Sequence, residues 1–258
     1  MKQYGLKLSV PKGEDYIFGS SLPIKQINLS GDWTNYLPVR EFQNMGGFEP
    51  YACVSYALLN CLETLIKFKY GEDVNYSDRF LASVSGTKEG GNDPQVVCEF
   101  LRKIGVVKED IWSMTGITSF EEYYKPLPPK LYELAQEFNT KWSFLHEYVP
   151  SDPNAISKAL TCSPLLVSVP AWFMNSNGRY YRPFGMQDNH ATTLFYESDD
   201  NFRRVFDTYD SPCIKDLEWD VIPMVVKRFT IEKKVINSLQ KPSLGARILA
   251  WLKKFYNL

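Results

Sequence analysis

Hydrophobic positions divide the chain into a helical first half and a strand-rich second half. Residues 52–69 carry apolar side chains around most of a helical circumference, which predicts a central, buried helix ending at Gly71. Two more helices are predicted, over 94–104 with proline in the first turn and over about 129–139. The first half therefore reads as a set of packed helices.

The second half reads mainly as antiparallel sheet. Loose alternation predicts a strand over 142–149 and an apolar run predicts another over 165–169, with a short helix at 153–160 between them. Helices followed by strands are typical of the α+β class. We expect two lobes, a helical lobe at about 50–135 and a β lobe at about 140–235.

A hairpin is predicted where an apolar run beginning at His190 is followed by another ending at Tyr209. Ser-Asp-Asp-Asn at 198–201 separates the two runs and suits a four-residue loop. Mirror pairing about this loop places His190 opposite Tyr209. Asp207 is then diagonal to His190 on the same face, within reach of a hydrogen bond. A slip of one residue would turn Asp207 to the other face.

The two ends of the chain differ from this core, which spans 43–235. Residues 1–42 are rich in proline, glycine and serine, and we expect an extended arm. The sequence of the tail, 236–258, predicts an amphipathic helix over 242–258. This helix packs on its own protein or docks on a membrane surface or a partner protein.

Composition narrows the classes of function. The chain has 258 residues, 44% of them hydrophobic, and 29 basic against 30 acidic residues, so no nucleic-acid partner is expected. No apolar run is long enough for a signal peptide or a membrane span. Five cysteines without a CxxC pattern indicate reduced thiols in a cytoplasmic, reducing compartment. We expect no metal and no cofactor.

Cys53 and His190 are the candidates for chemistry. Cys53 stands where the central helix begins, and the free N–H groups and partial positive charge of a helix start stabilise a thiolate. The alternative is a buried structural cysteine, as expected for Cys61. The hairpin supplies His190 with Asp207, and we expect this carboxylate on Nδ1, leaving Nε2 to face the thiol.

Four segments together resemble the papain-like cysteine peptidases, in the order Cys, His, Asp. The segment from Gln43 to Cys53 is similar to the family's oxyanion-hole segment, and Gly90-Gly91 before a helix to its substrate-binding glycines. Residues 189–191 resemble the histidine motif, and 206–209 occupies the place of Asn-Ser-Trp. The resemblance covers about residues 40 to 230 and implies a two-lobed papain-like fold with polypeptide substrates.

The resemblance assigns a role to each residue. Cys53 is the nucleophile, His190 the general base and acid, and Asp207 the orienting group. Gln43 and the Cys53 backbone N–H would bind the oxyanion. The residues implied to lie near substrate are Gly90, Gly91, Pro94, Asn189, Ala191 and Tyr209.

Some positions depart from the family's pattern. Val54 stands where the family usually has tryptophan, and Asp207 and Tyr209 replace asparagine and tryptophan. The family's disulfide cysteines and a long pro-segment ahead of Gln43 have no evident equivalents. These departures suggest a compact microbial or bacteriophage type, which would be cytoplasmic, or virion-associated if phage-encoded.

Two other functions use the same residues. A transamidase or deamidase would pass the acyl group to a different acceptor, and an inactive papain-like scaffold would serve a structural or assembly role. An open Cys53–His190 contact, or a cleft filled by residues 1–42, would favour the scaffold.

Of the other motifs, His146 reads as a strand residue and Asp199-Asp200 as a solvated turn. Residues 86–91 lack the spacing of a phosphate-binding loop.

Overall fold

A computed structural model describes residues 4–20, 23–209 and 211–235. The predicted C-terminal amphipathic helix lies outside this part of the chain. None of the helices in the described part is long and apolar enough to cross a membrane.

The described helices are α1 (Cys53–Tyr70), α2 (Asp78–Val84), α3 (Pro94–Ile104), α4 (Phe120–Tyr123), α5 (Pro129–Lys141) and α6 (Pro153–Leu160). The strands are β1 (Trp142–Tyr148), β2 (Leu165–Val169), β3 (His190–Ser198), β4 (Phe202–Phe206), β5 (Ile214–Glu218) and β6 (Val226–Lys233). The predicted helices and strands are present with small shifts at their ends. Among these α-helices and strands, α2, α4, β5 and β6 were not predicted, and neither was a short 3-10 helix at Thr34–Tyr36.

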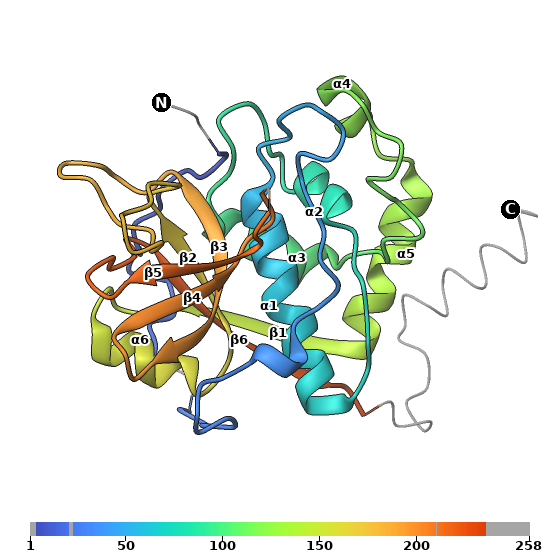
Figure 1. Ribbon diagram of the computed structural model, residues 1–258. Helices are drawn as coiled ribbons and strands as arrows, with labels where there is room; N and C mark the ends of the chain where they lie inside the picture. Colours follow the sequence, from blue (N-terminus) through green and yellow to red (C-terminus); the bar gives the residue numbers. More distant parts are fainter. Residues whose placement is uncertain (1–3, 21–22, 210, 236–258) are drawn as a thin grey trace, which may run out of the picture.

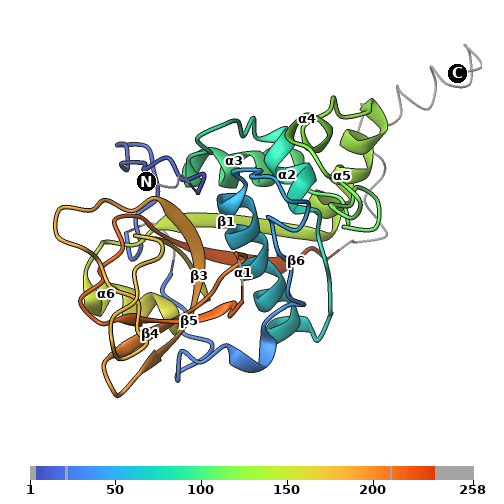
Figure 2. The same cartoon turned by 45° about the horizontal axis from the view of Figure 1, so that its top comes forward.

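All six strands form one antiparallel sheet in the order β1-β6-β2-β3-β4-β5. Helix α1 lies between β3–β5 and the group of helices α2–α5 (Figures 1 and 2). The expectation of an α+β fold with a central buried helix is confirmed.

The central position of α1 follows from its side chains. Every residue from Cys53 to Ile66 is buried, so the helix contacts protein on all sides along four turns. It ends at Gly71, whose φ of 65° is the left-handed conformation that glycine adopts without a steric penalty. On one side it packs on β3, where the Thr193 hydroxyl donates to the Ala57 carbonyl at 3.0 Å. This contact brings the start of α1 toward the start of β3.

The β3–β4 hairpin has a shorter loop than predicted. Ser198 belongs to β3 and pairs with Phe202, so the loop is 199–201. That shift alone would turn Asp207 to the wrong face. A β-bulge between Leu194 and Tyr196 inserts one residue and restores the register, so that Thr193 pairs with Phe206. Near His190 the register is therefore the predicted one, although the loop prediction was wrong by one residue.

The described part of the N-terminal arm attaches to both halves of the fold. Leu6 forms a parallel bridge with Asn92, and Ile17 forms one with Tyr148. Further along, the Trp33 indole donates to the Leu160 carbonyl at 2.9 Å. The arm thus crosses the surface from α3 to α6.

Candidate active site

Cys53 occupies the first position of α1 and is completely buried. Burial raises the pKa of its thiol far above the ordinary value of 9.0. Backbone N–H groups of Ala191 and Val54 act in the opposite direction, while the negative charges of Glu49 and Asp207 add to the rise. The enclosed site therefore holds a neutral thiol, and the Ala191 contact places its sulfur next to the start of β3.

His190 and Asp207 form a buried pair. Nε2 of His190 donates to Oδ1 of Asp207 at 2.6 Å, and neither side chain is exposed to solvent. Burial alone would raise the pKa of Asp207, but the charges and hydrogen bonds of His190 and Lys215 outweigh it and lower that pKa. Asp207 is therefore a carboxylate that accepts from the imidazole and fixes its orientation.

The nitrogen that contacts Asp207 differs from our expectation. Nε2, rather than Nδ1, faces the carboxylate, and Nδ1 has no hydrogen-bond partner in the described part of the chain. Sequence spacing places the imidazole near the carboxylate but does not determine which ring edge faces it, because that depends on the χ2 rotation. Nδ1 is thus the nitrogen left for the thiol.

Lys215 of β5 holds the other oxygen of Asp207. Its Nζ donates to Asp207 Oδ2 at 2.7 Å and to the carbonyls of Tyr209 and Pro212 at 3.0 and 2.8 Å. These contacts use all three ammonium hydrogens. The carboxylate is consequently held between two cationic or cation-forming side chains, although Lys215 itself was not predicted.

Three aromatic rings enclose the imidazole of His190. The ring centroids of Tyr4, Tyr209 and Trp172 lie 5.2, 5.2 and 5.6 Å from it. Tyr209 is fully buried and its hydroxyl donates to Glu49, just ahead of α1. The structure thus places Tyr209 as a shield of the His190–Asp207 pair and gives it a contact with the segment that leads into Cys53.

Gln43 lies fully buried beside the residue that follows Asp207. Its Nε2 donates to the Thr208 hydroxyl at 2.8 Å, and its backbone N–H donates to the Thr208 carbonyl at 3.0 Å. Its Oε1 has no partner in the described residues. A half-turn of the amide would let Oε1 accept from Thr208 and leave the NH2 group as the unpaired donor. Gln43 therefore lies beside the segment that carries Asp207, with one of its two amide atoms unpaired among the described residues.

The glycine segment before α3 contacts the N-terminal arm. Gly90 and Gly91 have φ values of 80° and 86°, a conformation that disfavours any residue with a side chain. A Cβ on Gly91 would lie 1.6 Å from the Gly5 carbonyl oxygen. The arm pairs with the next residue, because Asn92 N–H donates to Gly5 and Lys7 N–H donates to Asn92, both at 3.0 Å. Residues 4–7 therefore cover the place where the resemblance puts substrate.

The remaining residues of the predicted substrate site have structural contacts. Pro94 is buried at the first turn of α3. The Asn189 side chain accepts from the Ala171 N–H at 2.8 Å, which holds the turn after β2. Ala191 is buried and its backbone faces Cys53. Ala191 thus contacts the thiol through its backbone.

The other candidates from the sequence lie away from Cys53. All five cysteines are unpaired and buried, and Cys61 is 3.8 Å from the Thr193 hydroxyl. Asp199 and Asp200 are exposed in the hairpin loop. Among the described residues, no three His, Cys, Asp or Glu side chains cluster in a way that would hold a metal ion.

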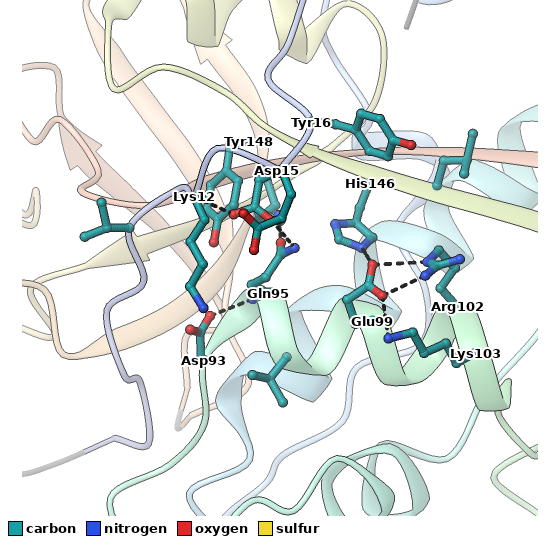
Figure 3. Close-up of a pocket in the computed structure, with 15 residues that line it drawn as sticks. Lys12, Asp15, Tyr16, Asp93, Gln95, Glu99, Arg102, Lys103, His146 and Tyr148 are labelled. Carbon is teal, nitrogen blue, oxygen red and sulfur yellow. Dashed lines mark hydrogen bonds and ion pairs between the residues drawn. The ribbon is translucent and has the colours of Figure 1, made fainter. Parts of the chain in front are cut away.

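His146 lies in β1 on a separate cavity of about 530 Å³ between the arm, α3 and β1. Figure 3 shows Glu99 of α3 between His146 on one side and Arg102 and Lys103 on the other. None of the predicted site residues lines this cavity. Polar and charged side chains line this cavity and Cys53 does not, so it is a second polar region apart from Cys53.

Sequence reasoning missed Lys215, Trp172, Tyr4 and Glu49. Lys215 had a weak signal, because residues 214–218 alternate and place a lysine on the inner face of a strand with Leu217. The other three sit in loops or in the arm and reach the site through tertiary contacts alone.

Comparison with solved structures shows cysteine proteases among the similar folds. Xylellain, a cysteine protease from Xylella fastidiosa, matches with a TM-score of 0.64 and 16% identity over 91% of this chain and 96% of that one. Procathepsin L 3 of Tenebrio molitor matches with a TM-score of 0.59 and 12% identity over 82% and 71%. The bromelain protease from Ananas comosus, in complex with the inhibitor E64, matches with 0.55 and 19% over 78% and 98%.

No protein-family model and no curated protein matches the sequence. The structural likeness spans nearly the whole described core, and its low identity means that it bears on the fold. The chain has a divergent form of the papain-like cysteine protease fold.

Proposed function

We propose that this protein is a papain-like cysteine peptidase with Cys53 as nucleophile, His190 as general base and acid, and Asp207 as the orienting group. The observation that carries the proposal is the buried hydrogen bond between His190 and Asp207, at 2.6 Å, on the strand that packs against the start of α1. The fold it shares with cysteine proteases supports the same conclusion.

In the proposed reaction, Nδ1 of His190 takes the proton of the Cys53 thiol as sulfur attacks a peptide carbonyl. The backbone N–H of Cys53 and the turned amide of Gln43 donate to the oxyanion. Nδ1 then protonates the leaving amine, and water hydrolyses the thioester with His190 again as base. Asp207 holds the imidazole through Nε2 throughout, so that the opposite nitrogen stays aimed at the thiol.

Access to the thiol requires the arm to move. Tyr4 covers His190, and residues 5–7 are paired with Asn92. Moving the arm admits water and substrate, which removes part of the burial that raises the thiol pKa. Opening the cleft therefore exposes Cys53 and also favours its thiolate. We propose that the arm-covered form is a closed state of the enzyme.

The test compares peptide cleavage and thiol labelling. Cys53→Ala should abolish cleavage without loss of folding, and an epoxysuccinyl or iodoacetamide reagent should label Cys53 faster than the other four thiols at mildly acidic pH. Labelling of Cys53 no faster than that of Cys61 would refute the proposal. Mass spectrometry after limited labelling identifies the modified residue.

A variant of the arm shows whether the closed state limits access. Tyr4→Ala should raise the labelling rate of Cys53 by about tenfold, since a loss of about 1.4 kcal/mol of closing energy is a factor of ten in population. Tyr16→Ala is the matched control, because Tyr16 belongs to the same arm but lines the cavity at His146. Equal rates in the two variants would contradict the closed-state interpretation.

The covered cleft also favours a second function, an inactive scaffold with a papain-like fold. In that case residues 4–7 are a permanent part of the structure, as the sequence alternative anticipated. Tyr4→Ala would then lower the stability of the protein and leave Cys53 no more reactive than the other thiols. The labelling experiment thus separates the two functions.

A further inference from the structure

The carboxylate of Asp207 accepts hydrogen bonds from two buried side chains, His190 and Lys215. Asp207 and His190 are 1% and 0% exposed, and the Lys215 residue is 5% exposed. Asp207 Oδ1 accepts from His190 and Oδ2 accepts from Lys215 at 2.7 Å. A charged amine this deeply buried is rare unless it is paired, and here the pairing is with the group that orients the candidate base.

Charge balance gives Lys215 a function beyond packing. When a thiolate and an imidazolium form, Cys53 and Asp207 are negative and only His190 is positive. Lys215 adds a second positive charge, and these four charges then sum to zero around the buried carboxylate of Asp207. An unbalanced charge there would be costly, because burial penalises it and the low dielectric strengthens its effect on the neighbours.

We propose that Lys215 is a positioning residue that neutralises Asp207 and fixes its carboxylate, so that Asp207 and Lys215 act together as one neutral orienting group for His190. This inference rests on the proposed function. It explains how an aspartate serves at a place where a neutral amide is expected from the resemblance. Lys215 does not touch the reacting atoms and acts through Asp207.

Other ionisable groups also face the pair, from several elements. Cys53 comes from the start of α1, Glu49 from the segment before it, and Tyr4 from the arm. Tyr209 follows β4, and Tyr180, which precedes β3, feels the charge of Asp207. Lys215 supplies a positive charge next to Asp207 among these groups, through its ion pair with that carboxylate.

The test follows the titration of His190 by NMR in the full-length protein. The chain has two histidines, so their imidazole signals are readily assigned. Lys215→Met should move the His190 titration to higher pH, because a positive charge close to the pair is lost. Asp207→Asn should move it to lower pH, because Lys215 then faces a neutral amide.

The double variant separates charge balance from a structural role. The double variant, Asp207→Asn with Lys215→Met, has no charge at either position. Its His190 should therefore titrate at a higher pH than the His190 of the Asp207→Asn single variant. The value of kcat/KM should recover by about tenfold relative to Asp207→Asn alone. A merely structural Lys215 predicts an additive loss and no return of the titration. This comparison remains informative if Lys215→Met alone does not fold.

Lys227→Met provides a matched control, because Lys227 is another fully buried lysine. Its Nζ donates to Gln95 at 2.6 Å, and its charge helps to lower the pKa of His146 after the larger effect of burial. This variant should move the titration of His146 to higher pH and leave that of His190 in place. Lys215→Met should instead move the titration of His190 to higher pH and leave that of His146 in place.

The outcomes distinguish the two proposals. If peptides are cleaved but the His190 titration does not respond to Lys215, charge balance is wrong and the peptidase stands. If the titration shifts as expected in a protein that cleaves no peptide, the peptidase proposal fails and charge balance is supported as a property of the site. Equal shifts at both histidines in Lys227→Met and Lys215→Met would also overturn the inference.

Discussion

The two histidines of this protein each have a carboxylate as immediate partner but lie in different surroundings. Nε2 of His190 contacts Asp207 at 2.6 Å, and Nε2 of His146 contacts Glu99 at 3.0 Å. In both rings Nδ1 is buried and has no hydrogen-bond partner among the described residues. A carboxylate–imidazole pair is therefore present twice, and the pair alone does not make a site.

The difference lies in what packs against the ring. The Cys53 sulfur is beside Ala191, the neighbour of His190, because α1 begins where β3 begins. His146 has instead the ring of Phe144, with a centroid separation of 5.9 Å, and a Glu99 that also binds Arg102 and Lys103. Topology therefore brings the proposed nucleophile to one histidine and ion-paired side chains to the other.

Exchanging each histidine for glutamine should give the largest contrast. His190→Gln removes the proton acceptor of the proposed reaction and should lower kcat/KM by about a thousandfold or more. His146→Gln should change kcat/KM by less than about threefold, because no reacting group is near it. Steady-state cleavage of a peptide substrate checks both. Similar losses of kcat/KM in the two variants would contradict the assignment of His190, rather than His146, as the general base.

Local patterns carried much of the fold in this chain. Residues 94–104, 153–160 and 165–169 form α3, α6 and β2 within the predicted limits, because prolines and apolar runs mark their ends. Helix α2 was missed because Asp78 and Arg79 look like solvated residues. Arg79 is nevertheless buried, and its guanidinium donates to backbone carbonyls that include Tyr123 and Ser113.

The pairing of His190 with Asp207 was predictable, but through two errors that cancelled. The loop was assigned one residue too many, and the bulge beside Phe195 added the residue back. A bulge of this kind depends on packing against α1 and is not visible in alternation. The pair was therefore predicted from the correct register at His190, although the loop length behind that register was wrong and the bulge was not foreseen.

Lys215 and the arm could not be predicted with the same tools. Strand β5 carries Lys215, Asp216 and Glu218 in five residues, which is a weak strand signal. The contact of Gly5 with Gly91 joins residues far apart in sequence and depends on the absence of a side chain at Gly91. Such contacts are set by tertiary structure and leave no periodic pattern.

The effect of pH on stability should be the next largest contrast. Burial, and then the charge of Lys227, lower the pKa of His146 to about 4 from 6.5. Because the unfolded chain binds the proton more readily, His146 contributes stability above pH 6.5 that is lost as the pH falls toward 4. The upper limit of this loss is about 3 kcal/mol. His146→Gln should flatten this dependence.

Urea unfolding at several values from pH 7 to 5 measures the slope for the wild type and for His146→Gln. The carboxyl of Glu99 does not interfere in this window. Its hydrogen bond with Arg102 outweighs its burial and lowers its pKa to about 2, so its contribution is lost only below pH 4.5. Parallel slopes for the two proteins would contradict the expected neutral state of His146.

The smallest effect should come from a lysine beside the second histidine. Lys103 lies 3.1 Å from Glu99, but its side chain is 61% exposed. Solvent screens such a pair, so Lys103→Met should change the free energy of unfolding by less than about 0.5 kcal/mol and leave the titration of His146 nearly unchanged. Lys215→Met makes the same substitution beside His190, where the ammonium is buried. If burial decides the effect, the His146 titration in Lys103→Met should shift less than the His190 titration in Lys215→Met. Equal shifts would mean that proximity to a carboxylate, rather than burial, gives a lysine its effect on the titration of the neighbouring histidine. The comparison of the two histidines would then lose the feature that makes Lys215 part of the site.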